Sequence, residues 1–272
     1  MFPLYDAHTH LNTESMADQR KQYMNFFVEA GGSGLVNSWA SDFYNRKGIE
    51  IAQESASLYP DLTVKMSLWL HPLECVENII TKQNIEEQMQ NMKKLYEANK
   101  QHIVAIWEAG IDLHFPNGYE TLKIQKQLFD FQCQRAQELN LPIVVHSRDA
   151  FEETMEILDK YKNLVVYIHC RSYGTEEYRY LEQNFPRLFI GFCGNVTYKN
   201  AQTLRDTLSI VHPSQVIMET DAPYLAPQVL RGQVNHPANI SYNYEFCAAH
   251  LGVLLPEFAA QIQVNFKRLY SL

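Results

Sequence analysis

The chain has 272 residues, of which 46% are hydrophobic and 20% are charged. This balance is typical of a globular protein with a substantial buried core, and it excludes an intrinsically disordered chain. Lysine and arginine number 23 against 31 acidic residues, which gives a net charge of −8, whereas a protein that depends on nonspecific phosphate contacts is usually basic. Any nucleic-acid substrate must therefore be attracted by local charge at the site.

The cysteines and the first residues indicate the compartment. The five cysteines are dispersed, with no CxxC spacing, which is typical of reduced thiols in a cytoplasmic protein. Residues 1–6 lack the basic region and long apolar run of a signal peptide. No uncharged apolar stretch approaches the roughly 20 residues that a membrane-spanning helix needs. We therefore expect a cytoplasmic protein without membrane contact, and we favour a monomer.

A short apolar, β-branched run followed by an amphipathic stretch recurs along the chain. It predicts strands at 3–8, 34–39, 63–70, 103–107, 142–146, 165–169, 188–192 and 215–219. Helix-like stretches lie at 18–30, 85–99 and 119–139, with a long loop at 226–236 and a terminal helix at 256–270. Alternating strands and helices imply parallel pairing through right-handed crossovers. The predicted fold is α/β, a (β/α)8 TIM barrel that forms one domain over residues 1–272.

Polar residues follow the apolar runs, where the active site of such a barrel lies. The first strand ends in the letters DAHTH, and His8 and His10 point the same way because side chains alternate along a strand. Later runs lead to four further metal-competent residues: Glu108, His146, His169 and Asp221.

Four histidines and two carboxylates are more donors than one tetrahedral ion needs, and they suit two ions that share a carboxylate. Two divalent cations carry +4 and two carboxylates −2, so the site keeps about +2 and attracts an anionic substrate. Paired cations lower the pKa of a water, and a neighbouring carboxylate can take its proton.

The order of motifs resembles that of the TatD family of metal-dependent deoxyribonucleases, which belongs to the amidohydrolase-like barrels. The matching segments are DAHTHL (6–11), LHP (70–72), EAGID (108–112), LPIVVHSRDA (141–150), IHC (168–170), GNVT (194–197), ETDAPYLAP (219–227), HPAN (236–239) and NFKRL (265–269). Together they run through the whole chain, although any one of them alone is a weak signal.

The resemblance implies a ligand set and an activity. The ligands would be His8, His10 and Asp221 for one ion, His146 and His169 for the other, and Glu108 for both. Asp221 and Glu108 would be the catalytic carboxylates, with Asp221 acting on the nucleophilic water. The implied reaction is hydrolysis of phosphodiester bonds in DNA, including from a strand end. Imidazole-rich ligation favours Zn, Mn, Ni or Co, and Mg is a further candidate.

Three departures from the family pattern lie at the mouth of the site and bear on the choice of substrate. Leu73 stands where many members have a second histidine, and Trp107 precedes Glu108 where the family usually has glycine. After His169 and Cys170 the chain continues Arg171-Ser172-Tyr173 in place of the usual phenylalanine and shorter path to glycine.

Four residues are candidates for substrate contact, each with a structural alternative. Arg148 either clamps a phosphate or pairs with an acid such as Asp149. Arg171 has a similar role, His71 lines the pocket or is structural, and Tyr224 stacks on a base or packs.

Two other functions stay open. The same ligands would serve hydrolysis of a small amide, ester or lactone. A barrel that binds a partner without catalysis is the third interpretation, and the complete ligand set argues against it.

Overall fold

The computed structural model describes residues 2–38, 41–170 and 173–272. Eight parallel strands form one sheet in chain order, from β1 next to β2 through to β7 next to β8. The strands are β1 (Leu4–Thr9), β2 (Gly32–Asn37), β3 (Thr63–Leu68), β4 (Ile103–Asp112), β5 (Ile143–Arg148), β6 (Val166–Ile168), β7 (Leu188–Phe192) and β8 (Val216–Met218). The eight predicted strands and their parallel order are thereby confirmed, although residue 39, the predicted end of the second, lies outside the described residues.

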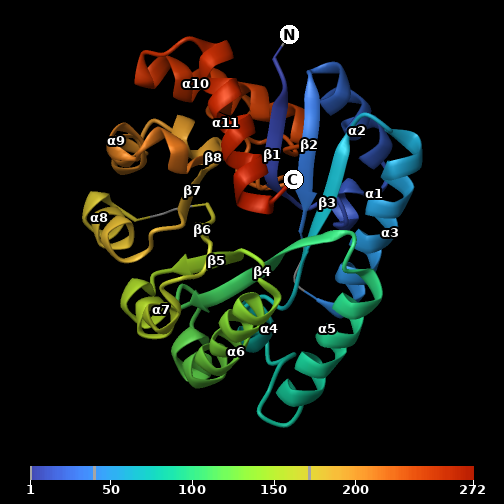
Figure 1. The fold of residues 1–272 in the computed structure, drawn as a ribbon, viewed down its shortest axis with the longest axis vertical. Coiled ribbons are helices and arrows are strands. Elements are labelled where there is room, and N and C mark those ends of the chain that lie inside the picture. The colour runs from blue at the N-terminus through green and yellow to red at the C-terminus, as the bar shows by residue number, and fades with distance from the viewer. Residues whose placement is uncertain (1, 39–40, 171–172) are drawn as a thin grey trace.

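Helices flank the strands (Figure 1). They are α1 (Glu14–Ala17), α2 (Arg20–Glu29), α3 (Asp42–Leu58), α4 (Leu73–Val76), α5 (Ile85–Asn99), α6 (Gly118–Leu139), α7 (Phe151–Leu158), α8 (Thr175–Asn184), α9 (Gln202–Ile210), α10 (Ile240–Leu251) and α11 (Leu255–Tyr270). The predicted helix at 85–99 has the bounds of α5, and the loop at 226–236 contains one short 3-10 turn, Gln228–Leu230. Within the described part of the chain, no helix is both long enough and apolar enough to cross a membrane.

The first and last strands meet and nearly close the sheet into a barrel. Thr9 and Ala222 form a parallel bridge beyond the end of β8. The His10 amide donates to the Ala222 carbonyl oxygen at 2.7 Å, and the Asp221 amide donates to the His8 carbonyl oxygen at 3.0 Å. These bonds bring the ends of β1 and β8 together, and with them two of the predicted site motifs.

Two apolar clusters hold the barrel. One takes side chains from every strand except β3, together with Phe266, Leu269 and Tyr270 at the end of α11. Because it joins strands from all around the sheet, this cluster fills the inside of the barrel below the site. The other, larger cluster lies between the strands and the helices. The side chains of the site therefore lie on close-packed apolar side chains inside the barrel.

Candidate metal centre

Strand β4 is longer than its apolar run predicts and carries a site residue within it. It continues to Asp112, so the expectation that a strand ends just before Glu108 is wrong. Its pairing with β5 shifts register between Ile106 and Ala109. Gly110 has φ +153°, and a Cβ there would lie 1.8 Å from the His146 carbonyl oxygen. Only glycine allows the two backbones to come this close, which puts Glu108 beside His146.

The two histidines of β1 and Asp221 form one group of donor atoms. His8 Nε2 lies 3.3 Å from His10 Nε2 and 3.4 Å from Asp221 Oδ1. The distance from His10 Nε2 to Asp221 Oδ1 is 3.0 Å. Alternation along the strand predicted that the two histidines face the same way, and the structure confirms it.

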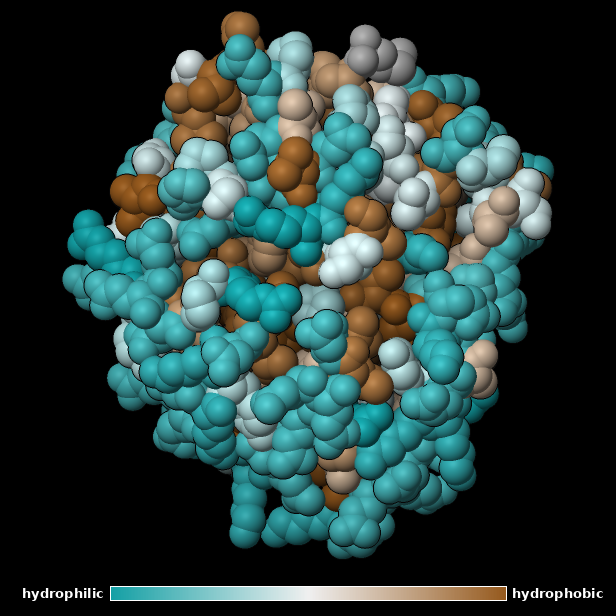
Figure 2. Space-filling model, in the orientation of Figure 1, coloured by the Kyte–Doolittle hydropathy of each residue, from teal (hydrophilic) through white to brown (hydrophobic). Residues whose placement is uncertain are grey.

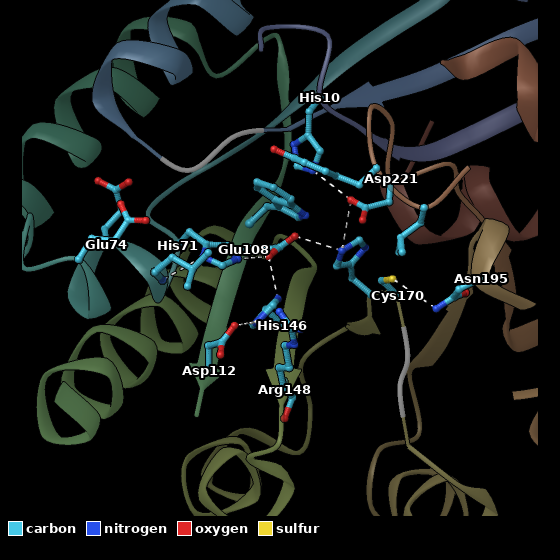
Figure 3. A pocket seen from close by; sticks show the side chains of 17 residues that line it. His10, His71, Glu74, Glu108, Asp112, His146, Arg148, Cys170, Asn195 and Asp221 are labelled. Carbon is cyan, nitrogen blue, oxygen red and sulfur yellow. Dashed lines mark hydrogen bonds and ion pairs between the residues drawn. The ribbon is translucent and has the colours of Figure 1, made fainter. Parts of the chain in front are cut away.

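Glu108 joins this group to the remaining histidines through its two carboxylate oxygens. Oε1 lies 3.5 Å from His8 Nε2 and 3.1 Å from His169 Nε2. Oε2 lies 3.0 Å from His146 Nδ1 and also contacts His71 Nε2. Figure 3 shows Glu108 in the middle of the cluster, with His146 and Asp112 on one side and Asp221 on the other. All six predicted ligands therefore come together around one carboxylate.

The donor set fits divalent cations. A tetrahedral ion with ligands at about 2.0–2.1 Å has neighbouring ligand atoms roughly 3.4 Å apart, close to the separations around His8. Groups of donors within 4.8 Å of one another include His8–His10–Glu108, His71–Glu108–His146 and His169–Cys170–Asp221. None of the groups found among the described residues holds both His146 and His169, which face different oxygens of Glu108.

Buried acceptors lie behind three of the histidines. His169 Nδ1 is 2.7 Å from Glu219 Oε2, and His146 Nε2 is 3.0 Å from Asp112 Oδ2. His10 Nδ1 is 2.9 Å from the Ser38 carbonyl oxygen. Such partners fix the ring orientation of a metal-binding histidine and raise its basicity.

Sequence reasoning did not assign Asp112 and Glu219 to the site. Both had a signal in their position along the chain. Asp112 is four residues after Glu108 on β4, and even spacing within a strand favours one face. Glu219 directly follows β8 and is two residues before Asp221.

Trp107 was known only as a departure from the family motif, and the structure gives it a contact in the centre. Its indole Nε1 donates to His8 Nδ1 at 2.7 Å. The indole ring centroid is 4.4 Å from that of His8 and 5.2 Å from that of His10. The side chain is buried, yet it lines the pocket.

Mutual contacts set the charges of the centre. Burial alone would raise the pKa of Asp221, but hydrogen bonds from His10 and His8 hold it below its ordinary value. The pKa of Glu108 is likewise held well below its usual range by His71 and His169 in spite of burial. Burial and repulsion from His169 lower the pKa of His8 to about 4. Both carboxylates are therefore ionised at neutral pH and the His8 ring is uncharged.

A pocket of about 650 Å³ opens over this cluster. Its lining includes His10, Glu108, His146, His169 and Asp221, while His8 lies beneath it, fully buried. Figure 2, in the orientation of Figure 1, shows another side of the molecule, where hydrophilic residues cover most of the surface and apolar ones gather near the centre.

The substrate candidates lie around the pocket. Arg148 and Tyr224 line it, and the ring of Tyr224, 50% exposed, is 5.7 Å from that of His10. The Arg148 guanidinium lies over Phe115 at 5.7 Å, and Asp149, its considered partner, contacts His114 instead. His71 also lines the pocket and contacts Glu108. Arg171 lies outside the described residues.

A TIM barrel whose open end carries histidines and carboxylates defines a class of barrels able to hold divalent cations. A family model described as TatD related DNase matches residues 5–271. The chain belongs to the TatD family, whose curated relatives carry the name metal-dependent hydrolase.

Relatives and solved structures cover nearly the whole chain. An uncharacterized metal-dependent hydrolase of Mycoplasma pneumoniae is 30% identical, with 98% of each chain covered. The uncharacterized metal-dependent hydrolase YabD of Bacillus subtilis is also 30% identical, with 99% of each chain covered. The crystal structure of YjjV, a TatD homologue from Escherichia coli, has a TM-score of 0.86 at 20% identity and covers 99% of this chain and 98% of its own. At 20% identity, the likeness to YjjV shows the fold and no more than the fold.

Proposed function

We propose that this protein is a deoxyribonuclease that hydrolyses phosphodiester bonds of DNA, including from a strand end, with two divalent cations. The observation that carries the proposal is the convergence of four histidine rings and two ionised carboxylates on the floor of one open pocket. The family's description as TatD related DNase supports the choice of DNA.

The proposed ligands divide between the two ions. His8, His10 and Asp221 hold the first, His146 and His169 hold the second, and Glu108 faces both sets through its two oxygens. Bound there, divalent cations lower the pKa of a water and neutralise the charge that develops on the phosphate oxygens. Zn, Mn, Ni, Co and Mg are the candidate ions.

Asp221 is the proposed proton acceptor. Its carboxylate lines the pocket and stays ionised because His10 and His8 hold its pKa below the ordinary value. An ionised carboxylate beside the attacking water can take the proton that the water loses. Glu108 is held in place from both sides by histidines, so its role is to keep the two halves of the site together.

Arg148 and Tyr224 are the proposed substrate contacts. Among the described residues no ion pair involves Arg148, and its guanidinium carbon lies over the Phe115 ring rather than beside a carboxylate. It is therefore available for bidentate binding of a phosphate. The half-exposed Tyr224 ring offers a surface on which a base can stack.

One observation favours a second candidate, hydrolysis of a small amide, ester or lactone. The pocket lining contains the acidic residues Glu74, Glu77 and Asp112 in addition to Glu108 and Asp221, and Arg148 is its one arginine or lysine among the described residues. Extra carboxylates in the lining repel a polyanion more than a small neutral substrate.

An Asp221→Asn variant tests the proposed function. We expect turnover of single-stranded DNA to fall at least about a hundredfold, because proton transfer is lost, while much of the metal content remains. The exposed Asp61→Asn is the matched control. Assays should compare DNA, a phosphodiester dye, small amides and lactones at equal metal loading.

The outcomes separate the candidates. Nuclease activity that survives in purified Asp221→Asn contradicts the role of Asp221. Wild-type activity confined to amides or lactones replaces the first candidate with the second. Absence of both activities and of metal uptake would favour a binding role without catalysis.

That residues 1–272 form a single domain, and that the protein is a cytoplasmic monomer, stay predictions.

A further inference from the structure

The four histidine rings of the candidate metal centre differ in what their second nitrogen contacts. A neutral imidazole binds a cation through one nitrogen and carries its proton on the other, which needs an acceptor. Three rings have such an acceptor: the Ser38 carbonyl oxygen behind His10, Asp112 behind His146 and Glu219 behind His169. In each of these rings the other nitrogen faces a carboxylate of the centre, Asp221 for His10 and Glu108 for His146 and His169, where a cation would bind.

His8 is the exception, because a donor lies behind it. The Trp107 indole N–H donates to His8 Nδ1 at 2.7 Å. An indole nitrogen can only donate, so His8 Nδ1 must accept and carries no proton. The one proton of the neutral ring is then on Nε2. That atom faces His10, Glu108 and Asp221, where a cation would bind.

We propose that Trp107 holds His8 in the tautomer that cannot ligate through Nε2, and so makes the cation site of His8, His10 and Asp221 the weaker of the two. The inference rests on the proposed metal-dependent function. Ligation by His8 requires the Trp107 N–H to give up its acceptor, and a buried N–H without an acceptor weakens binding by about ten- to a hundredfold. One cation is then resident, beside His146 and His169, and the other exchanges.

Packing keeps the indole in this position. Trp107 is 1% exposed, and its ring contacts both histidines of β1. It lies in β4 directly before Glu108, so the backbone that presents the shared carboxylate also presents the indole. Rotation away from His8 would disturb the apolar cluster inside the barrel, to which Trp107 belongs. Trp107 acts through His8 and is a positioning residue.

The test is a titration of chelator-stripped protein with Zn²⁺, followed by calorimetry and by metal analysis. In the wild type we expect two binding steps whose dissociation constants differ by about ten- to a hundredfold. Trp107→Phe keeps an aromatic ring but removes the donor, so His8 Nδ1 is free to carry the proton. In that variant the weak step should tighten by about tenfold or more, while the tight step stays unchanged.

Trp69→Phe is the matched control. Trp69 is as buried as Trp107, and its indole nitrogen has no hydrogen-bond partner among the described residues. The same substitution there should leave both binding steps as in the wild type. A tightening in Trp69→Phe would mean that loss of a buried indole, rather than of this hydrogen bond, changes the affinity.

Two results would overturn this inference without contradicting the proposed function. One is two binding steps of equal affinity in the wild type, and the other is a ratio of the two dissociation constants that Trp107→Phe leaves unchanged. No Zn²⁺ uptake by the wild type would contradict the proposed function itself. If Trp107→Phe does not fold, nitrogen-15 NMR of the histidine rings in the metal-free wild type decides. The proton of His8 is expected on Nε2, and a proton on Nδ1 would contradict the inference.

Discussion

Glu219 and Asp112 contact the second ring nitrogens of two candidate metal ligands, His169 and His146, and so fix the orientation of these rings. Glu219 is fully buried and accepts from the His169 ring, the Cys170 amide and the Tyr167 hydroxyl. Its carboxylate therefore orients the strand end as well as the ligand. Such partners fix which ring nitrogen faces the centre. The orientation of the His146 and His169 rings is set by carboxylates outside the predicted ligand set.

Another single residue, Glu74, lines the pocket and gives a pH-dependent prediction. Burial and repulsion from Glu77 raise the pKa of Glu74 from 4.5 to about 7. The folded state therefore favours the protonated form. The stabilising contribution of that form is full below about pH 4.5 and is lost as the pH rises through 7.

We expect Glu74→Gln, which keeps the neutral shape, to stabilise the protein over the wild type by ~1 kcal/mol at pH 8 and by almost nothing at pH 5, after allowance for solvent screening. Urea unfolding of metal-free protein at the two pH values measures the difference. The exposed Glu245→Gln is the control, and a Glu74→Gln effect of equal size at both pH values would contradict the prediction.

At the scale of elements, β4 determines the geometry of the centre. It contributes Trp107, Glu108 and Asp112, and its register against β5 shifts between Ile106 and Ala109. Glu108 and Asp112 contact the two nitrogens of His146, while Trp107 contacts His8. Gly110 makes the approach possible, because any side chain there would overlap the His146 carbonyl group. A regular strand could not present two successive residues, the indole and the carboxylate, to the same centre.

We therefore expect Gly110→Ala to destabilise the protein by about 3 kcal/mol or more, since both the positive φ and the clash oppose it. Gly232 is a matched control, because it also has a positive φ but nothing within 4 Å of its added Cβ. Gly232→Ala should cost only about 1 kcal/mol. Denaturant unfolding compares the two, and equal losses would show that backbone strain alone is responsible.

At the scale of the whole molecule, the first strand, β1, is hydrogen-bonded to the last two helices, α10 and α11. The buried Tyr244 hydroxyl of α10 donates to the Tyr5 carbonyl oxygen at 3.0 Å and accepts from the Tyr5 amide at 3.1 Å. The Tyr270 hydroxyl of α11 donates to the Ala7 carbonyl oxygen at 2.8 Å. These bonds fix β1, which carries His8 and His10, to the helices that end the chain.

Tyr244→Phe removes both bonds to Tyr5 and leaves two buried backbone groups unpaired. We expect a loss of ~2 kcal/mol in the free energy of unfolding, with the metal content of the folded protein unchanged. Tyr242→Phe, at a hydroxyl-bearing ring that is 40% exposed, is the control and should lie within about 0.5 kcal/mol of the wild type. A Tyr244→Phe protein as stable as the wild type would show that β1 is held by other contacts.

Much of the fold could be predicted because its signals are local. Apolar runs mark each of the eight strands, and β7 and α5 have the predicted bounds. Other elements lacked such a signal. Helix α3 has Gly48 in its interior, where the residue packs against Met66 of β3. Glycine is a poor helix former and interrupts the apolar pattern of the helix, and the reason for it is a contact that exists only in the folded barrel. Helix α10 is apolar on several sides and shows little periodicity.

The sequence by itself determined the parallel barrel and the positions of six metal-competent residues along the chain. Both depend on patterns that span a few neighbouring residues. Tertiary structure decided what each nitrogen and oxygen of those residues faces. His8 meets Trp107 across 99 positions of sequence, and β4 runs past Glu108 because Gly110 fits against β5. The physical reason is that hydrogen-bond direction and close packing depend on atoms brought together only when the barrel closes.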